Sequence, residues 1–292
     1  MKFTGRVVHG ANVGEHFGVA TANLELDQEI SLDEGVYFVR TRVLQNPGSE
    51  YNALLHYGHR KTFGGEFSIE VHILDFKQDL YNQKLEVEVL HRERDVRKFD
   101  NADALFTQIE QDKVRAQKFF LRRKIAQHWR DISDEERRKL DEQAVELLEQ
   151  NEFFLKATRV FAFAPMRDEL HFVQKMCSIF PDKDYFWPKV EHDKIHFFLD
   201  TFENLKLGAF NIREPKVAFE AIPRTQDVVI VPALAADEWG YRLGRGKGYY
   251  DRFLATTKSH SITLLPYFAI SPKKIPTEPH DQMIDEVLVI KK

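Results

Sequence analysis

The sequence is poor in the features that mark secreted and membrane proteins. Its 292 residues include a single cysteine, Cys177, which excludes an internal disulfide and fits a reducing compartment. The first ten residues, MKFTGRVVHG, contain no apolar stretch of the kind found in secretory signals. The longest apolar run, VVIVPALAA, is too short to span a bilayer and contains Pro232. We therefore expect a cytoplasmic protein with no membrane partner.

An excess of either charge is also missing. The chain has 42 Lys and Arg against 46 Asp and Glu, a formal net charge of −4 at pH 7. This balance argues against general nucleic-acid binding, so an anionic ligand must be met by local positive charge. Hydrophobic residues make up 43% of the chain, as in ordinary globular proteins. Nothing in the sequence indicates an oligomeric state.

Glycine and proline are both absent between Gly65 and Pro165. A flexible tether between domains would be rich in Gly, Ser or Pro, whereas the chain is long enough for two domains. We therefore place the boundary within helical sequence near residues 112–118. The expected domains are residues 1–115 and 116–292.

The first hundred residues carry strand patterns. Segments such as VYFVRTRV and FSIEVHILDF are short, rich in β-branched or aromatic residues, and separated by turn sequences such as NPGSE. This arrangement predicts a small antiparallel β-barrel.

The pattern changes to helical spacing from about Asn101. A second helix is predicted after Ser133, which forms a capping box with Glu136. RVFAFAP and DVVIVPAL then read as buried strands separated by helical or loop segments. These features predict an open α/β sheet in the second domain.

The densest chemistry lies in RLGRGKGYYDRF, residues 242–253, where three glycines alternate with basic residues. The stretch matches neither the Walker pattern nor the dinucleotide pattern. Glycines let backbone N–H groups approach an anion closely, and ligands of open α/β sheets bind beyond the carboxyl ends of strands. We predict a phosphate-binding loop, the alternative being a tight surface turn with solvated charges. The residues of the predicted phosphate-binding loop, for which the family resemblance described below implies ATP as the ligand, are Arg242, Leu243, Gly244, Arg245, Gly246, Lys247, Gly248, Tyr249 and Tyr250.

Three side chains at the end of this loop suggest further roles. Asp251 is suited to holding the Mg²⁺ that accompanies a nucleotide. Tyr249 and Tyr250 would form the wall of a pocket or stack on a planar ligand, the alternative being a core-packing role for one of them.

DEWGYRLGRGKGYYDRFL resembles the signature of 5-formyltetrahydrofolate cyclo-ligase, also called methenyltetrahydrofolate synthetase. The resemblance covers residues 116–290 and includes QKFFLRRKIAQHWRDISDEER, FAPMRDEL and EPHDQMIDEV. It implies an α/β domain that converts 5-formyltetrahydrofolate to 5,10-methenyltetrahydrofolate with ATP and Mg²⁺.

The same resemblance implies roles for individual residues. Lys118 and Arg122 would reach ATP, although basic residues four apart on a helix are more often plain surface. Glu169 would contact the folate, although it could simply cap the next helix. Arg245 and Lys247 would be catalytic by neutralising charge during phosphoryl transfer. The remaining implied residues are Ala164 and Tyr249 on the folate and Asp281 as a second Mg²⁺-binding acid. Two positions depart from the family pattern in the pocket lining, Ala236 where Phe is usual and Ile270 where Gln is common.

The N-terminal half has candidates of its own. Thr21 and Asn23 are small polar residues suited to a Mg²⁺–nucleotide, or to an Asx or ST turn. The alternation in FSIEVHILDF places Ile69, Val71 and Ile73 on one face and Glu70 on the other. Glu70 is therefore a candidate general base, or a residue on the solvent face of a strand.

Together these segments resemble the riboflavin kinase domain over residues 1–115, through ATAN, GVY, KTF, EVHILDF and RDVRKF. The resemblance implies that Gly10, Thr21 and Asn23 bind ATP and Mg²⁺. It also implies that Glu70 deprotonates the riboflavin 5′-hydroxyl and that Arg94 lies near the flavin.

Four positions depart from that family. Ala20 and Lys61 replace prolines, Asn82 replaces a glycine, and Glu15 stands where a basic residue is usual. Because Thr21, Asn23 and Glu70 are retained, we expect riboflavin phosphorylation beside the folate reaction, and no FAD synthesis. The alternative is a working cyclo-ligase attached to an inactive flavin-binding or structural barrel.

Overall fold

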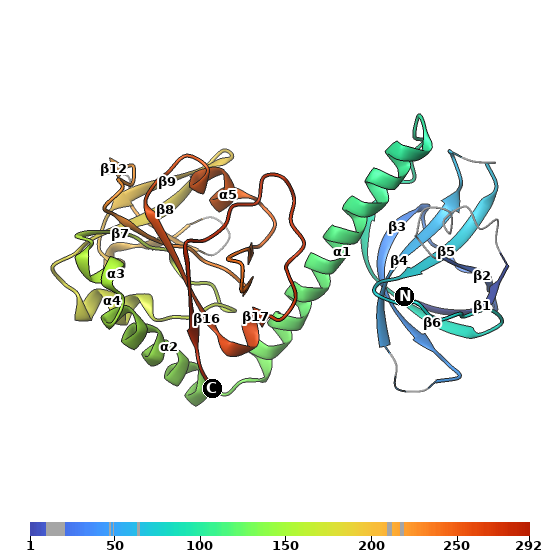
Figure 1. Ribbon diagram of the computed structural model, residues 1–292, viewed down its shortest axis with the longest axis horizontal. Coiled ribbons are helices and arrows are strands. Elements are labelled where there is room, and N and C mark those ends of the chain that lie inside the picture. Colours follow the sequence, from blue (N-terminus) through green and yellow to red (C-terminus); the bar gives the residue numbers. More distant parts are fainter. Residues whose placement is uncertain (10–20, 47, 49, 63–64, 209–211, 217–218) are drawn as a thin grey trace. The chain divides into compact units, whose positions relative to one another are not determined.

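The computed structural model describes residues 1–9, 21–46, 48, 50–62, 65–208, 212–216 and 219–292 (Figure 1). The chain divides into two compact units, Met1–Phe120 and Leu121–Lys292. This division falls within helix α1 (Ala102–Asp131), on which the boundary expected between residues 115 and 116 also lies. Within the described ranges, no helix is long and apolar enough to cross a membrane.

The N-terminal unit contains a closed six-stranded barrel in the order β1-β2-β5-β4-β3-β6, with all neighbours antiparallel. This confirms the predicted antiparallel barrel. The strands are β1 (Lys2–Val8), β2 (Ala22–Leu26), β3 (Gly35–Val43), β4 (Glu50–His59), β5 (Phe67–Ile73) and β6 (Lys84–Arg94).

The two faces of the barrel strands bury different clusters. Leu55, Val71 and Leu85 belong to the barrel core, which also includes Val39 and Val87. The alternate residues Val36, Phe38 and Leu54 pack instead against Ala116 and Phe120 of α1. Successive strand residues point to opposite faces, so the first part of α1 covers one outer side of the barrel.

One turn of the barrel explains a departure noted in the sequence. Asn82 has a φ of +62°, in the left-handed region that favours glycine. Asparagine is among the few other residues that adopt this conformation at low cost. Its Oδ1 also accepts a hydrogen bond from Nη1 of Arg6 at 3.0 Å. The replacement of glycine by asparagine therefore keeps the turn.

The C-terminal unit is built on a seven-stranded mixed sheet in the order β12-β9-β8-β7-β13-β16-β18. Its strands are β7 (Arg159–Phe161), β8 (Asp184–Glu191), β9 (Lys194–Leu199), β12 (Glu220–Ala221), β13 (Val228–Ile230), β16 (His260–Pro266) and β18 (Glu286–Ile290). The four pairs from β8 to the β18 edge are parallel, and the two pairs at the β12 edge are antiparallel. This confirms the predicted α/β sheet.

Smaller elements surround this sheet. The helices are α2 (Asp134–Glu149), α3 (Glu152–Lys156), α4 (Val173–Ile179) and α5 (Tyr249–Leu254), with short 3₁₀ turns η2 (Phe202–Asn204) and η4 (Tyr267–Ala269). A three-stranded sheet joins β15 (Arg242–Leu243), β14 (Ala235–Asp237) and β17 (Ile270–Ser271), and a separate pair joins β10 (Lys206–Leu207) and β11 (Arg213–Glu214). The Ser133 hydroxyl accepts from the Glu136 N–H at 3.1 Å, so the predicted cap at the start of α2 is present.

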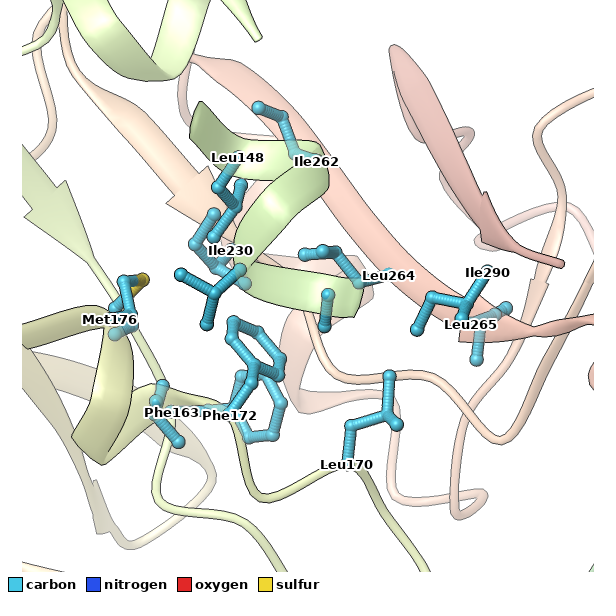
Figure 2. Packing of buried hydrophobic residues seen from close by; sticks show 14 of the residues in the cluster. Leu148, Phe163, Leu170, Phe172, Met176, Ile230, Ile262, Leu264, Leu265 and Ile290 are labelled. Atoms are coloured by element: carbon cyan, nitrogen blue, oxygen red, sulfur yellow. The ribbon is translucent and has the colours of Figure 1, made fainter. Parts of the chain in front are cut away.

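The main sheet is buried on both faces. Val228 and Ile230 face the large cluster that includes residues of α2, α3 and α4, part of which is shown in Figure 2. The alternate residues Val229 and Val231 face a second cluster, against which Tyr250 and Phe253 of α5 pack. The sheet is therefore a central layer between helices, and the segment that follows the carboxyl end of β7 contacts the glycine-rich loop through Arg245.

Candidate functional site

The glycine-rich loop of the C-terminal unit connects β15 to α5. Gly246 and Gly248 have φ of +89° and +65°, and Gly248 is the N-cap of α5. A Cβ on Gly246 would lie 3.4 Å from Nη2 of Arg122. Two of the three glycines therefore serve left-handed backbone conformations, and one also permits the close approach of an arginine.

That arginine is fixed to the loop. Nε of Arg122 donates a 2.9 Å hydrogen bond to the carbonyl oxygen of Gly244. Burial lowers the pKa of Arg122, and the negative charges of Glu278 and Asp281 oppose the shift. Lys118, one turn earlier on α1, is 7% exposed. Both predicted ATP-binding residues of α1 are thus more enclosed than ordinary surface residues.

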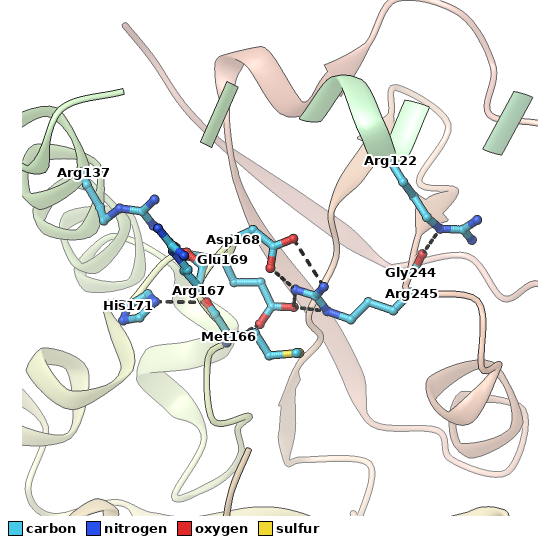
Figure 3. A network of polar contacts seen from close by, with 9 residues as sticks. All are labelled: Arg122, Arg137, Met166, Arg167, Asp168, Glu169, His171, Gly244 and Arg245. Carbon is cyan, nitrogen blue, oxygen red and sulfur yellow. Dashed lines mark hydrogen bonds and ion pairs between the residues drawn. The ribbon is translucent and has the colours of Figure 1, made fainter. Parts of the chain in front are cut away.

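Arg245 extends from the loop to the segment that follows β7 (Figure 3). Its Nε and Nη2 both donate to Oε1 of Glu169, at 3.1 and 3.0 Å, and its guanidinium also pairs with Asp168. Burial raises the pKa of Asp168, but the hydrogen bond and charge of Arg245 outweigh it, and the net shift is downward. Arg245, which is predicted to bind phosphate, and Glu169, which is predicted to bind folate, are therefore in direct contact.

The segment carrying Glu169 is clamped by α2. Arg137 donates to the carbonyl oxygens of Arg167 and Trp129, at 3.0 and 3.1 Å. Oδ1 of Asp141 accepts the His171 N–H at 2.6 Å. Oε2 of Glu169 itself accepts the Met166 N–H at 2.8 Å, and α4 has no side-chain cap. Glu169 thus closes its own turn and does not cap the following helix.

The two predicted Mg²⁺ acids lie on neighbouring segments. Oδ1 of Asp251 accepts from Nη2 of Arg242 at 2.9 Å and from the Gln282 N–H at 3.2 Å. Gln282 directly follows Asp281, whose Oδ2 accepts the Glu278 N–H at 2.8 Å. No cluster of three or more metal-binding side chains occurs in the described part of the chain. Mg²⁺ is commonly held by one or two carboxylates together with phosphate oxygens and water, so this pair of acids fits the ion.

The two loop tyrosines differ in environment. The ring of Tyr250 packs against the second core cluster, and burial raises the pKa of its hydroxyl. The Tyr250 hydroxyl and Nε of Arg242 are buried and make no hydrogen bond within the described structure. Tyr249 is partly exposed, with the Arg252 guanidinium 5.2 Å from its ring centre. Tyr250 therefore combines core packing with a polar atom suited to a ligand.

Three other predicted residues of this unit occupy contrasting positions. Lys247 is exposed, and its carbonyl oxygen accepts from Arg252 at 3.2 Å. Ala164 is 5% exposed and belongs to the large core cluster just beyond β7. Leu243 is buried in β15, where it pairs with Ala235. Lys247 therefore adds positive charge at the loop surface, whereas Ala164 and Leu243 belong to the apolar core.

Sequence reasoning missed the framework before the loop. Asp237 is 1% exposed and accepts the N–H groups of Trp239, Tyr241 and Ile275 at 2.7–3.0 Å. Gly240 has a φ of +88°, and a Cβ there would lie 2.7 Å from the Ile284 carbonyl oxygen. The motif letters D-x-x-G were the available signal, because a buried aspartate and a positive-φ glycine commonly build a tight turn.

The two departures from the cyclo-ligase pattern are neighbours. Ala236 of β14 pairs in register with Ile270 of β17. Ala236 is fully buried, and Ile270 packs against the same core cluster. A small and a large side chain therefore lie side by side, which accommodates both changes in one place.

In the barrel, strand register brings distant residues into one row. Asn23 of β2 pairs with Glu70 of β5, Glu70 with His56 of β4, His56 with Val36 of β3, and Val36 with Arg94 of β6. Directly paired residues point to the same face of a sheet. The row therefore gathers three predicted residues, Asn23, Glu70 and Arg94, on the outer face of the barrel.

Glu70 and Asn23 are joined by a residue that sequence reasoning did not assign. Nε of Arg60 donates to Oε1 of Glu70 at 2.7 Å, and its Nη2 donates to Oδ1 of Asn23 at 3.0 Å. Ser68 donates to the same Glu70 oxygen at 2.8 Å. Asn23 thus lies in a strand and binds a side chain, which differs from the Asx turn considered above. The signal for Arg60 was its position next to the KTF motif.

The other end of the row is closed by α1. Nε of Arg94 donates to Oδ1 and Oδ2 of Asp112 at 3.2 and 2.9 Å, and Nη2 donates to Oδ2 at 2.7 Å. Asp112 is 2% exposed. His56 lies between Arg94 and Glu70. Burial lowers the pKa of His56, although the charge of Glu70 opposes the shift. The guanidinium of Arg94 is therefore committed to anchoring α1 in this structure.

The start of the barrel site is only partly described. Gly10, and the departures Glu15 and Ala20, lie outside the described residues. Thr21 directly precedes β2 and is half-buried. Lys61 donates from Nζ to the Val96 carbonyl oxygen at 3.0 Å, so the lysine that replaces proline ties its loop to the segment after β6.

The barrel therefore presents a carboxylate and an amide in one row, and the α/β unit presents a basic glycine-rich loop beside a pair of acids. The family model for the 5-formyltetrahydrofolate cyclo-ligase family matches residues 114–290, and the riboflavin kinase model matches residues 1–120. The chain belongs to the 5-formyltetrahydrofolate cyclo-ligase family and carries a riboflavin kinase domain in front of the cyclo-ligase domain.

Individual relatives agree with this division. The bifunctional riboflavin kinase/FMN adenylyltransferase of Haemophilus influenzae is 39% identical over 117 residues, and that of Bacillus subtilis is 36% identical over 121 residues. Each match covers 40% of this chain and 37% of the relative, so the chain spans little more than a third of the curated relatives it matches. The structure of Aquifex aeolicus 5,10-methenyltetrahydrofolate synthetase is 31% identical, with a TM-score of 0.53, covering 59% of this chain and 89% of that one.

Proposed function

We propose that the protein is bifunctional. Its C-terminal unit converts 5-formyltetrahydrofolate to 5,10-methenyltetrahydrofolate with ATP, and its N-terminal unit phosphorylates riboflavin to FMN with ATP. The contact between Arg245 and Glu169 carries the first part, because it joins the side proposed for phosphate to the side proposed for folate. The Asn23–Glu70 pair carries the second part.

In the cyclo-ligase reaction the formyl oxygen attacks the γ-phosphorus of ATP, and the bond from that phosphorus to the bridging oxygen breaks to release ADP. N10 of the folate then attacks the activated carbon and loses its proton to solvent, and the bond from that carbon to the phosphorylated oxygen breaks to release phosphate. Arg122, Arg245 and Lys247 supply positive charge around the transferring group, which is the main protein contribution in phosphoryl transfer. Asp251 and Asp281 would hold Mg²⁺, which neutralises phosphate charge when bound.

Arg245 already has partners in the structure, because its guanidinium is paired with Asp168 and Glu169. A phosphate that binds Arg245 therefore competes with these two carboxylates, and a folate that binds Glu169 competes with Arg245. Burial alone would lower the pKa of Arg245, but the hydrogen bond that it donates to Asp168 and the negative charge of Glu169 outweigh burial, so the net shift of the pKa is upward and the arginine stays ionised. The arginine is therefore available as a full positive charge when the phosphate arrives.

In the kinase reaction Glu70 takes the proton of the riboflavin 5′-hydroxyl. The oxygen forms a bond to the γ-phosphorus of ATP, and the bond to the bridging oxygen breaks to release ADP. A carboxylate held beside a strand-borne amide suits this role, since one group handles the proton and the other lies toward the nucleotide. The alternative, a flavin-binding barrel without turnover, is favoured by one observation, the engagement of Arg94 by Asp112.

The decisive test measures both products from one preparation. FMN formation from riboflavin and Mg-ATP is compared among wild type, Glu70→Gln and Glu88→Gln, with methenyl-folate formation as the internal standard. Glu88 is a partly exposed glutamate on β6 of the same barrel, paired with Lys2, and is the matched control. We expect Glu70→Gln to lose FMN formation by about 10²–10⁴-fold while the control retains it. Wild type that cyclises folate and makes no FMN would establish the inactive barrel.

A further inference from the structure

Arg60 follows β4 directly and is held in place by its own backbone. Its N–H donates to the Glu66 carbonyl oxygen at 2.9 Å, and its carbonyl oxygen accepts the Gly65 N–H at 3.1 Å. The side chain is 22% exposed and that of Glu70 is 21% exposed, so the pair is only partly reached by water. Both ends of Arg60 are therefore fixed, the backbone by the β4–β5 connection and the guanidinium by two acceptors.

The hydrogen bonds that Glu70 accepts from described residues fall on one of its two oxygens. Oε1 accepts from Nε of Arg60 at 2.7 Å and from Oγ of Ser68 at 2.8 Å. Ser68 and Glu70 are two residues apart on β5 and so share a face. Two donors on Oε1 fix the plane of the carboxylate and direct Oε2 away from them.

The same guanidinium also binds Asn23. Nη2 donates to Oδ1 of Asn23 at 3.0 Å. A guanidinium presents its donors in a rigid planar fork, which a lysine ammonium cannot reproduce. One side chain thus sets the distance between the carboxylate and the amide that the proposed kinase reaction requires.

We propose that Arg60, supported by Ser68, is the positioning residue of the kinase site, and that Oε2 of Glu70 is the atom that accepts the hydroxyl proton. This inference rests on the proposed riboflavin kinase function. In the step itself the O–H bond of the 5′-hydroxyl breaks toward Oε2, the new O–P bond forms, and the electron pair of the broken P–O bond leaves with ADP.

The test is the kinetics of FMN formation in Arg60→Ala, Arg60→Lys and Ser68→Ala. A misplaced general base lowers kcat and leaves substrate binding intact, so Arg60→Ala is expected to lose about 10²-fold in kcat with little change in the KM for riboflavin. Arg60→Lys should recover part of the loss, and added guanidinium ion at millimolar concentration should restore activity to Arg60→Ala. The same ion should not restore Glu70→Gln.

The matched control is Arg42→Ala. Arg42 also pairs with a glutamate, Glu50, on the outside of the barrel, but it is half exposed and lies six residues along β3 from the row. It should keep wild-type kinetics. Folding of each variant is checked by circular dichroism, and Ser68→Ala tests the same oxygen without removing the arginine.

The outcomes separate the two claims. FMN formation by wild type with kcat of Arg60→Ala and Ser68→Ala within threefold would overturn the role of Arg60. A fall in kcat that guanidinium does not restore would also overturn it, because the loss would then be structural. Wild type that makes methenyl-folate and no FMN would overturn the kinase function itself.

Discussion

The two candidate sites are assembled from different kinds of contact. In the barrel, Asn23 and Glu70 are neighbours because β2 and β5 are hydrogen-bonded in register. In the α/β unit, Arg245 and Glu169 are neighbours because their side chains bind one another across two loops. A backbone register survives changes in surrounding side chains, whereas a loop contact depends on the residues that make it.

This difference bears on the departures from each family pattern. The barrel has lost a glycine at Asn82 and a proline at Lys61, yet Asn82 keeps the left-handed turn and Lys61 ties its loop to Val96. The loop site keeps all its charged residues, and its departures, Ala236 and Ile270, lie together in a small sheet beside it. We infer that the barrel tolerates change within its site better than the loop site does.

The largest effect is expected on cyclo-ligase activity, because the contact between Arg245 and Glu169 also belongs to the proposed reaction. Arg245→Ala removes a charge from the proposed phosphate site and leaves the 7% exposed Glu169 without its guanidinium partner. Cyclo-ligase kcat/KM should fall by about 10²–10³-fold, with FMN formation unchanged. Steady-state kinetics of both reactions measure this, with the exposed Arg138→Ala as control. A loss of less than tenfold would mean that the loop charge is redundant.

The next effect falls on the stability of the barrel. Asp112→Ala breaks a buried ion pair and leaves Arg94 uncompensated, which costs about 3–5 kcal/mol in comparable cases. Urea unfolding should show this loss, and Asp103→Ala, an exposed aspartate on the same helix, should show far less. Because the row is set by strand register, FMN formation well below the unfolding temperature should change less than tenfold. A large activity loss in a stable variant would instead give Arg94 a direct role.

A smaller effect is expected from the framework of the loop site. Gly240→Ala places a Cβ 2.7 Å from the Ile284 carbonyl oxygen at a φ of +88°. We expect a cost of about 1–3 kcal/mol and a reduced cyclo-ligase rate, because the displaced segment carries Asp281. Gly48→Ala is the control, with a φ of +110° and nothing within 4 Å. Equal destabilisation by both variants would assign the cost to backbone conformation alone.

The smallest effect is expected on thermal stability, from Asp141, the carboxyl group of α2 that accepts the His171 N–H. Burial raises the pKa of Asp141, and the hydrogen bond from His171 opposes the shift. An acid whose pKa is raised on folding stabilises the fold below its ordinary pKa, and this contribution is lost as the pH rises through the folded pKa. Asp141→Asn keeps an oxygen for His171 and carries no charge. Its melting temperature should exceed that of wild type by about 1 °C at pH 7, and the gap should close toward pH 4.

Much of the fold could be predicted from local pattern. Strand alternation indicated the barrel, helical spacing indicated α1, and Ser133 with Glu136 indicated the start of α2. These signals are local because they arise from side-chain periodicity and from caps.

The contacts within the sites could not be predicted in the same way. Arg60 meets Asn23, 37 residues earlier, and Arg245 meets Asp168, 77 residues earlier. Such pairs depend on strand register and loop course, which no local pattern encodes. The motifs indicate which residues to consider, and the structure shows which other residues they contact.

Helix α1 bears on any attempt to separate the two proposed activities by dividing the gene. Its first part covers Val36, Phe38 and Leu54 of the barrel, and its later residue Arg122 binds the Gly244 carbonyl. A cut before Ala102 would leave an apolar barrel wall in water and invite aggregation, whereas a cut within the helix would divide one continuous run of backbone hydrogen bonds. The two proposed catalytic units are therefore joined by a helix that makes contacts in each of them, and dividing the chain is expected to damage at least one unit.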